Sequence, residues 1–412
     1  MNKKKFDLFN ITWYIIGSLS YGFTSLIYMI IINRLLNIEA TGQYSFAFAI
    51  ASIFYTIGVY YGMTYQVTDV SNKYSDTDYI YNRLTSCFIM FILSLIFVIF
   101  NKYSESKILL VLLLVCYRGF DALFDALHAI IQKRDFIYKI GLLVFFRTIL
   151  LIIVFLIITL IFRNLSISVI SIVLLDLLFT VAVELPIVKK MLVSSKFNFK
   201  KNIKLLCEGF FVFLFTFLAM FILNSPKYVI DIYLNDELQG IFGIIFMPSS
   251  FMSMVSIYFI HPFLNEITEC IKCNNYKGLS NIIFRLSMII FVFGSGVSFV
   301  AFLIGIPVLE LVYGINLVNY RFDLLIIMIG TIWYSLYSLL SSIFIAMRRN
   351  VYQVIILILI SAFSYFICNI LISKYSVLGA SYSYFVIMFV QLFIYVISYF
   401  AIVFKKSVGK KI

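Results

Sequence analysis

Four ionisable residues share one face of a helix that we expect at 107–131. Arg118, Asp121, Asp125 and His128 follow one another at intervals of three, four and three positions. That spacing places all four side chains along one side of an α-helix. At the centre of a membrane helix each charge costs at least about 2.5–3.5 kcal/mol, so these groups have to pair with one another or line a polar cavity.

The two helices expected next, at 140–162 and 167–188, add Arg147, Asp176 and Glu184. Arg147 and Asp176 fall well inside their apolar runs, so the same restriction applies to them. Glu184 lies close to the end of its run, and its side chain is expected to extend toward the membrane surface.

These charges allow two interpretations, which the sequence leaves open. In the first, Arg118 pairs with Asp121 and Arg147 pairs with Asp125 or Asp176, so that the ion pairs only hold neighbouring helices together. In the second, the charges line a lumen that binds an anionic group and a coupling cation, H⁺ or Na⁺. In that lumen the anion-binding residues are Arg118 and Arg147, and the ion-coupling residues are Asp121, Asp125, Asp176 and His128.

A stripe of polar and aromatic residues follows the first expected helix, at 11–32. Its members are three or four positions apart, which is helical spacing. Such a stripe is either a seam between helices or the wall of a lumen. In a lumen the tyrosine rings and hydroxyls would suit sugars, with Tyr14, Tyr21 and Tyr28 as substrate-binding residues; the whole stripe is Asn10, Tyr14, Ser18, Tyr21, Ser25 and Tyr28.

The composition is that of a membrane protein. Of the 412 residues 63% are hydrophobic and 12% are charged, with a mean hydropathy of +1.05. In water-soluble domains about 45–50% of the residues are apolar and about 25% are charged. The close cysteine pair Cys270 and Cys273 has no neighbouring histidine and no second pair. We therefore expect no metal and no cofactor.

Twelve apolar runs are long enough to cross a bilayer as helices. The longest connections between them are expected at 189–204, 224–239 and 265–279, so no large domain lies outside the membrane. The predicted fold is therefore an all-α polytopic membrane protein of about 12 transmembrane helices. The runs are 11–32, 42–66, 79–100, 107–131, 140–162, 167–188, 204–223, 240–264, 280–304, 321–346, 351–372 and 379–404.

The positions of the basic residues predict the orientation of the chain. Of the 32 lysines and arginines, 23 flank the side on which the chain starts, 7 flank the opposite side, and 2 lie inside helices. In this count Arg83 belongs to the first group and Lys227 to the second. By the positive-inside rule both termini are cytoplasmic. The net charge of +13 is thus explained by topology, and we expect no nucleic acid partner.

A short motif occurs twice and indicates a duplicated chain. The pattern Leu-Asn-x-Glu-x-x-Gly lies at 36–42 and again, 198 positions later, at 234–240. Each Gly is expected to open the next helix. The repeat divides the chain into an N-terminal six-helix half, 1–200, and a C-terminal six-helix half, 201–412. With six helices each, the halves have the same orientation and would enclose a central cleft, as in parallel-repeat transporters.

The second copy of the motif follows a segment that resembles a known family. The chain reads Asn-Ser-Pro-Lys-Tyr at 224–228 and Gly-Ile-Phe at 240–242. This is similar to the loop between helices 7 and 8 of the Wzx-type O-antigen and capsule flippases, the polysaccharide biosynthesis proteins, although Lys227 stands where that family has Arg. Further similarities are Gly-Gln-Tyr-Ser at 42–45 and the corner residues Gln132, Arg134 and Asp135.

The resemblance implies a member of the multidrug/oligosaccharidyl-lipid/polysaccharide transporter superfamily. Such a protein is a flippase, not an enzyme, in the bacterial cytoplasmic (inner) membrane. Its cargo would be a polyprenyl diphosphate-linked oligosaccharide, either an O-antigen unit of lipopolysaccharide biosynthesis or a capsule repeat unit, moved by alternating access and coupled to a cation. The roles given above to individual residues rest on their spacing and not on the resemblance.

Two other functions compete with this one. A multidrug or organic-cation antiporter of the same fold would use acidic groups and would not need arginines in its lumen. A membrane glycan polymerase usually carries a sizeable outer loop with catalytic Arg, Asp or His, and the outer connections expected here are short.

Overall fold

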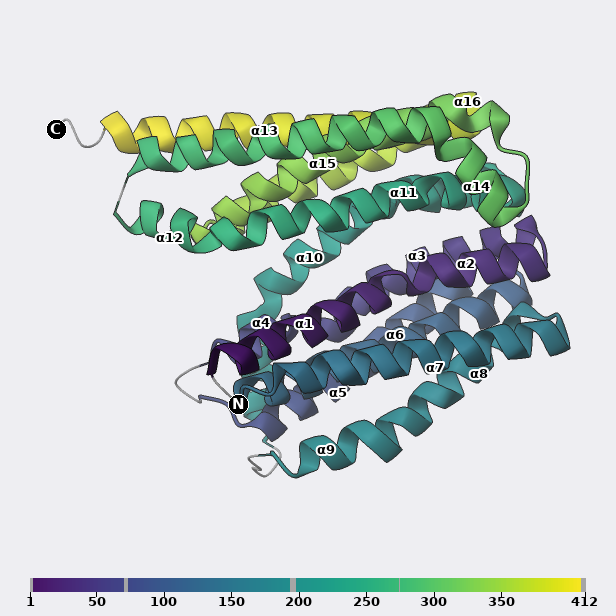
Figure 1. Cartoon of the computed structure of the whole chain (residues 1–412), viewed down its shortest axis with the longest axis horizontal. Helices are drawn as coiled ribbons and strands as arrows, with labels where there is room; N and C mark the ends of the chain where they lie inside the picture. Colours follow the sequence, from purple (N-terminus) through teal and green to yellow (C-terminus); the bar gives the residue numbers. More distant parts are fainter. Residues whose placement is uncertain (1–2, 70–72, 193–197, 274, 409–412) are drawn as a thin grey trace. The chain divides into compact units, whose positions relative to one another are not determined.

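The computed structural model describes residues 3–69, 73–192, 198–273 and 275–408, and every regular element in them is a helix (Figure 1). The expected all-α fold is confirmed. The chain forms two compact units, Met1–Met220 and Phe221–Ile412.

In the first unit α3 packs against α6 and α5, α5 against α6, and α1 and α8 against α7. A π-helical segment, Thr180–Glu184, joins α8 to α9. The helices are α1 (Lys3–Gly22), α2 (Thr24–Leu35), α3 (Ile38–Val59), α4 (Gly62–Val67), α5 (Asp76–Phe100), α6 (Glu105–Lys133), α7 (Ile137–Phe162), α8 (Leu165–Phe179) and α9 (Leu185–Lys189), followed by α10 (Phe199–Tyr233), which continues into the second unit.

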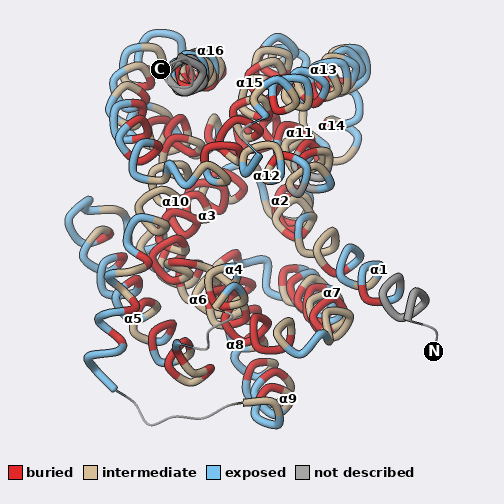
Figure 2. Tube along the Cα trace, turned by 90° about the vertical axis from the view of Figure 1, so that its left-hand side faces the viewer, coloured by how far each residue is buried: buried red, intermediate tan, exposed pale blue. Residues whose placement is uncertain are grey.

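In the second unit α15 packs against α11, α13 and α16. Figure 2 shows mainly buried residues along α15 and more exposed ones along α13. The exposed side chains are largely apolar, as expected of a surface that faces lipid. The helices are α11 (Asp236–Ile260), α12 (Leu264–Lys272), α13 (Tyr276–Val300), α14 (Ile306–Tyr313), α15 (Arg321–Ala346) and α16 (Asn350–Val408).

The described residues supply the twelve expected membrane crossings. Ten of their helices are long and apolar enough to span a bilayer. The last of these, α16, is interrupted at Ser376, where φ is 56°, and so supplies two crossings. The more polar α6 adds another, because its 29 residues extend for about 43 Å at 1.5 Å per residue.

One expected connection is wrong. Residues 224–233 belong to α10, which includes Pro226 and ends only at Tyr233. Lys227, which we assigned to a loop, therefore lies inside a candidate membrane span. A helix can continue through proline in a membrane because no water is available to satisfy an unfolded backbone, and neighbouring groups compensate for the lost hydrogen bond.

The repeated motif forms a helix cap. The side-chain oxygen of Asn37 accepts a hydrogen bond from the backbone N–H of Ala40 at 2.8 Å, and Asn235 accepts one from Leu238 at 3.0 Å. Asparagine is one of the residues that best satisfy the free N–H groups at a helix start. The expectation that the glycines open these helices is wrong, because Gly42 and Gly240 are buried within α3 and α11.

Two glycines allow α1 and α7 to approach closely. A Cβ atom at Gly141 would lie 2.1 Å from the carbonyl oxygen of Trp13, and one at Gly17 would lie 2.4 Å from the carbonyl oxygen of Gly141. Small residues of this kind bring membrane helices into backbone contact. The contact holds the polar stripe of α1 beside α7, which carries Arg147.

Candidate functional site

A buried carboxylate, Asp121, connects three helices of the first unit. It accepts hydrogen bonds from Arg147 Nη2 at 2.8 Å, from Arg118 Nη1 at 2.9 Å and from Tyr21 Oη at 2.6 Å. Arg118 Nη1 also donates to Tyr21 Oη at 2.6 Å. Charge-assisted hydrogen bonds are roughly twice as strong as neutral ones. The network therefore fixes the side chains of α1 and α7 relative to α6.

Arg147 is the most fully compensated cation of the network. Its Nε donates to Asp176 Oδ1 at 2.7 Å and its Nη2 to Asp176 Oδ2 at 2.6 Å, a two-point contact in addition to the one with Asp121. Only 5% of the Arg147 side chain and none of the Asp176 side chain is exposed. The Arg147–Asp176 pair predicted above is present, and it joins α7 to α8.

Arg118 is bound less completely than Arg147. Its single carboxylate partner, Asp121, is shared with Arg147, and 12% of its side chain is exposed. The guanidinium carbon lies 4.3 Å from the centre of the Tyr55 ring and 5.0 Å from that of Phe48. The Nε–H of Arg118 has no acceptor within the described part of the chain. Arg118 thus keeps one donor that a bound anion could use.

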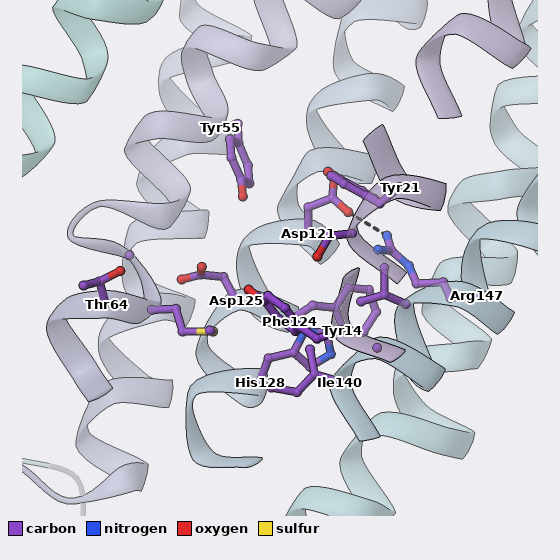
Figure 3. A pocket seen from close by; sticks show the side chains of 15 residues that line it. Tyr14, Tyr21, Tyr55, Thr64, Asp121, Phe124, Asp125, His128, Ile140 and Arg147 are labelled. Carbon is purple, nitrogen blue, oxygen red and sulfur yellow. Dashed lines mark hydrogen bonds and ion pairs between the residues drawn. The ribbon is translucent and has the colours of Figure 1, made fainter. Parts of the chain in front are cut away.

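Two cavities lie beside this network. The larger has a volume of about 460 Å³ and is lined by Tyr14, Asp125 and Arg147, among others. Figure 3 shows Asp121 facing Arg147 there, with Asp125 and His128 further along α6. The smaller, of about 180 Å³, is lined by Arg118 and by residues that follow Tyr21 at the end of α1 and the start of α2. Tyr21 lines both cavities, so the network lies between them.

The three predicted tyrosines occupy different surroundings. Tyr14 is 38% exposed and lines the larger cavity. Tyr28 is fully buried and lines the smaller one, with its ring centre 4.5 Å from that of Phe155 and 6.3 Å from that of Tyr44. The stripe, which continues from α1 into α2, is therefore both a seam against α7 and a cavity wall.

Asp125 has a partner that was not expected from the sequence. Arg83 Nη2 donates to Asp125 Oδ2 at 2.7 Å, and only 1% of the Arg83 side chain is exposed. We counted Arg83 among the residues that flank the membrane, whereas it is buried inside α5. No local spacing could have identified this pair, because its members are 42 positions apart on different helices.

The same guanidinium caps a broken helix. Helix α3 ends at Val59 and α4 begins at Gly62, with φ of 57° at Tyr60 and 72° at Gly62. A helix end leaves carbonyl groups without intrahelical partners. Arg83 donates to the carbonyls of Gly58, at 3.2 Å, and Val59. Arg83 thus provides hydrogen bonds to carbonyl groups that the break leaves without partners in the helix. Unpaired carbonyl groups would be costly in a membrane.

Substituting methionine for Arg83 is expected to destabilise the protein strongly. The substitution leaves Asp125 without its cation and the carbonyl of Val59 without this donor, whereas the carbonyl of Gly58 keeps its hydrogen bond from Ser86 Oγ. Breaking a buried ion pair costs about 3–5 kcal/mol, and because 22% of the Asp125 side chain is exposed we expect a loss at the lower end of this range. Thermal unfolding in detergent, followed by the loss of monodisperse protein, measures the effect. The double variant R83M/D125N should recover part of the loss, and an unchanged melting temperature in R83M would contradict the assigned role.

His128 also has a partner on another helix. Its Nε2 lies 3.1 Å from Glu184 Oε1, and its ring lies against that of Phe124 with centres 5.9 Å apart. Glu184 is fully buried in the π-helical segment. The expectation that it extends to the membrane surface is therefore wrong.

The corner residues of the resemblance surround a third cavity of the first unit, of about 640 Å³. Arg134 lies there, 4.0 Å from Asp76, and Lys73 donates to Glu208 at 2.6 Å. That hydrogen bond raises the pKa of Lys73 above its ordinary value. The cavity therefore has mixed charge, and its other charged lining residues are Asp69, Lys133, Asp135 and Lys201.

All nine predicted site residues lie in the first unit, and five of them (Arg118, Arg147, Tyr21, Asp121 and Asp176) form one network. The two interpretations of the charges are compatible in this geometry, because the ion pairs exist and also border cavities. Among the described residues, no group of three or more His, Cys, Asp or Glu side chains is arranged to hold a metal ion.

Comparison with known proteins places the fold. No family model matches the chain, and no curated protein matches it. Among solved structures, the lipid II flippase MurJ in an inward closed conformation is similar with a TM-score of 0.68 and 15% identity, over 93% of this chain and 87% of that one. An inward-facing multidrug resistance MATE family transporter of the MOP superfamily has a TM-score of 0.68 and 12% identity, over 98% and 99%. A point mutant of the Vibrio cholerae MATE transporter VcmN has a TM-score of 0.65 and 12% identity, over 99% of this chain and 98% of that one. The chain thus has the fold shared by these transporters and flippases of the MOP superfamily.

Proposed function

We propose that the chain is a flippase that moves a polyprenyl diphosphate-linked oligosaccharide across the bacterial cytoplasmic membrane by alternating access. The cargo is an O-antigen or capsule repeat unit. The observation that supports this most is Arg118, a membrane-embedded cation with an unused donor, beside tyrosine-lined cavities. A diphosphate is bound best by cationic hydrogen-bond donors, and sugars by rings that also carry hydroxyl groups. The likeness to a lipid II flippase over 93% of the chain adds support.

In this proposal Arg118 binds the diphosphate first. Arg147 is the second candidate, and it becomes available only when one of its two carboxylate contacts opens. Tyr14, Tyr21 and Tyr28 contribute ring faces and hydroxyl groups to the sugars or to the walls around them.

A coupling ion, H⁺ or Na⁺, is proposed to act on the carboxylates of α6 and α8. The side chain of Asp125 is 22% exposed, compared with 3% for Asp121 and none for Asp176. Asp125 is therefore the carboxylate that an entering ion reaches most easily. His128 lines the same cavity and follows on the same face of α6.

Complementation tests the proposal. The chain is expressed in strains that lack their own O-antigen or capsule flippase, and surface glycan is measured together with the amount of membrane protein. We expect surface glycan to return in at least one strain. Absence of glycan in every strain, with the protein present in the membrane, would count against the proposal. Normal export accompanied only by a change in polymer length would point to a glycan polymerase.

The alternative is an antiporter for multidrug or organic-cation substrates. It is favoured by the likeness to MATE transporters and by the carboxylates of Asp121 and Asp125 in the larger cavity. Efflux of ethidium from cells that express the chain distinguishes the two functions. In the antiporter, neutralising Arg118 leaves efflux intact, whereas neutralising Asp125 abolishes it.

A further inference from the structure

Lys227 of the second unit is compensated differently from the three arginines that lie within helices of the first unit and form ion pairs there. In the first unit Arg83, Arg118 and Arg147 each contact a carboxylate at 2.9 Å or less. In the second unit Lys227 lies in α10, inside a candidate span. Its ammonium group has no ion pair and no hydrogen bond within the described residues, and its one charge-related contact is an aromatic ring, that of Phe246.

The surroundings of Lys227 are aromatic. Its Nζ lies 5.1 Å from the centre of the Phe246 ring, which belongs to α11. That ring packs edge-on against Tyr384 of α16, with centres 5.0 Å apart. The hydroxyl of Tyr384 lies 3.4 Å from Thr331 Oγ1 of α15. The ammonium group is thus placed against an aromatic wall to which α11 and α16 contribute, and it is only partly buried.

An ammonium group placed in this way costs free energy as long as no ligand is bound. An ionised side chain in a membrane normally pairs with an opposite charge or faces a water-filled cavity, and a ring face offsets only part of the lost hydration. A methionine would fill similar space without that cost. An unpaired cation kept at this position therefore has the property required of an anion-binding residue, because the ligand supplies the missing charge.

We infer that Lys227 binds a phosphate oxygen of the cargo, and that Phe246 forms the wall beside that phosphate. This inference rests on the proposed flippase function and adds a binding residue in the second unit. A lysine ammonium is a compact charge with three donors, which suits the crowded oxygens of a diphosphate.

Transport by lysine variants provides the first test. K227M is expected to lower surface glycan about 10-fold per unit of membrane protein, the loss that corresponds to one charge-assisted hydrogen bond. K227R keeps the charge and should retain most of the transport. K374Q, at an exposed lysine of α16, is the matched control and should behave as the wild type. Wild-type transport by K227M would overturn the inference while leaving the proposed function intact.

Binding to purified protein in detergent separates the inference from the flippase function. The probes are undecaprenyl diphosphate, uncharged undecaprenol and phosphatidylglycerol. We expect K227M to raise the Kd for undecaprenyl diphosphate about 10-fold and to leave the weak binding of undecaprenol unchanged. If phosphatidylglycerol competes as well as undecaprenyl diphosphate, the lysine holds bulk lipid and the inference fails. This binding measurement tests the role of Lys227 even if the wild-type chain does not restore any surface glycan.

The stability of the empty protein excludes a purely structural role. Because Lys227 has no partner to lose among the described residues, the melting temperature of ligand-free K227M should equal or exceed that of the wild type. A lower melting temperature, together with unchanged affinity for undecaprenyl diphosphate, would show that the lysine serves folding and would overturn the inference.

Discussion

Substituting methionine for Arg147 is expected to remove most of the folded protein. Asp176 would lose both hydrogen bonds and its counter-charge while remaining fully buried. Asp121 would keep Arg118 and Tyr21. Leaving one buried charge uncompensated costs about 3–5 kcal/mol, a large fraction of the roughly 5–15 kcal/mol by which proteins are typically stable. The amount of monodisperse protein extracted in detergent and its melting temperature measure the effect.

The double variant R147M/D176N is the control for this prediction. It removes the orphaned charge together with the arginine, so it should recover much of the lost protein. Transport by the recovered variant then shows whether Arg147 also binds cargo. A single variant R147M with wild-type amount and melting temperature would contradict the pairing described here.

Replacing Arg118 by glutamine is expected to lower transport strongly and to leave the protein folded, in contrast to the expected effect of R147M. The protein should remain folded, because Asp121 keeps its contacts with Arg147 and Tyr21. Transport should fall at least about 10-fold, since the variant lacks the cation and the free Nε–H that the diphosphate would use. Surface glycan in the complemented strain, divided by the amount of membrane protein, measures this loss. R118K should be intermediate, because lysine keeps the charge without the planar fork of donors.

An exposed arginine of the second unit supplies the matched control for Arg118. Arg285 lies 5.7 Å from the ring of Phe263 and has no ion pair among the described residues. R285Q changes the net charge by the same amount and should transport normally. Full transport by R118Q would refute diphosphate binding at Arg118, and a collapse in protein level like that of R147M would assign it to structure.

The different expectations for Arg118 and Arg147 follow from how each is bound and not from where each lies in the sequence. Both are arginines inside expected membrane helices, and their positions in the sequence leave the same two alternatives open for both. The structure places two carboxylates around Arg147 and shares one of them with Arg118. Only that difference separates a residue expected to be needed for folding from one expected to be needed for transport.

The sequence by itself determined the features that depend on neighbours along the chain. Apolar runs of about 20 residues predict membrane helices, since only helices satisfy their own backbone in lipid. Helical periodicity placed Arg118, Asp121, Asp125 and His128 on one face of α6, and three of these side chains line the larger cavity. The repeated Asn-containing motif marked two helix starts, although the capping residue is the Asn and not the Gly.

Tertiary structure alone decided which groups meet across helices. The Arg83–Asp125 and His128–Glu184 pairs join residues 42 and 56 positions apart. Their contacts depend on how closely the helices pack, which periodicity does not specify. Tertiary structure also decided that α10 continues through Pro226 and that Lys227 belongs to this candidate membrane span. In water a proline would usually end the helix there, whereas in lipid an unpaired backbone costs more than a proline inside a helix.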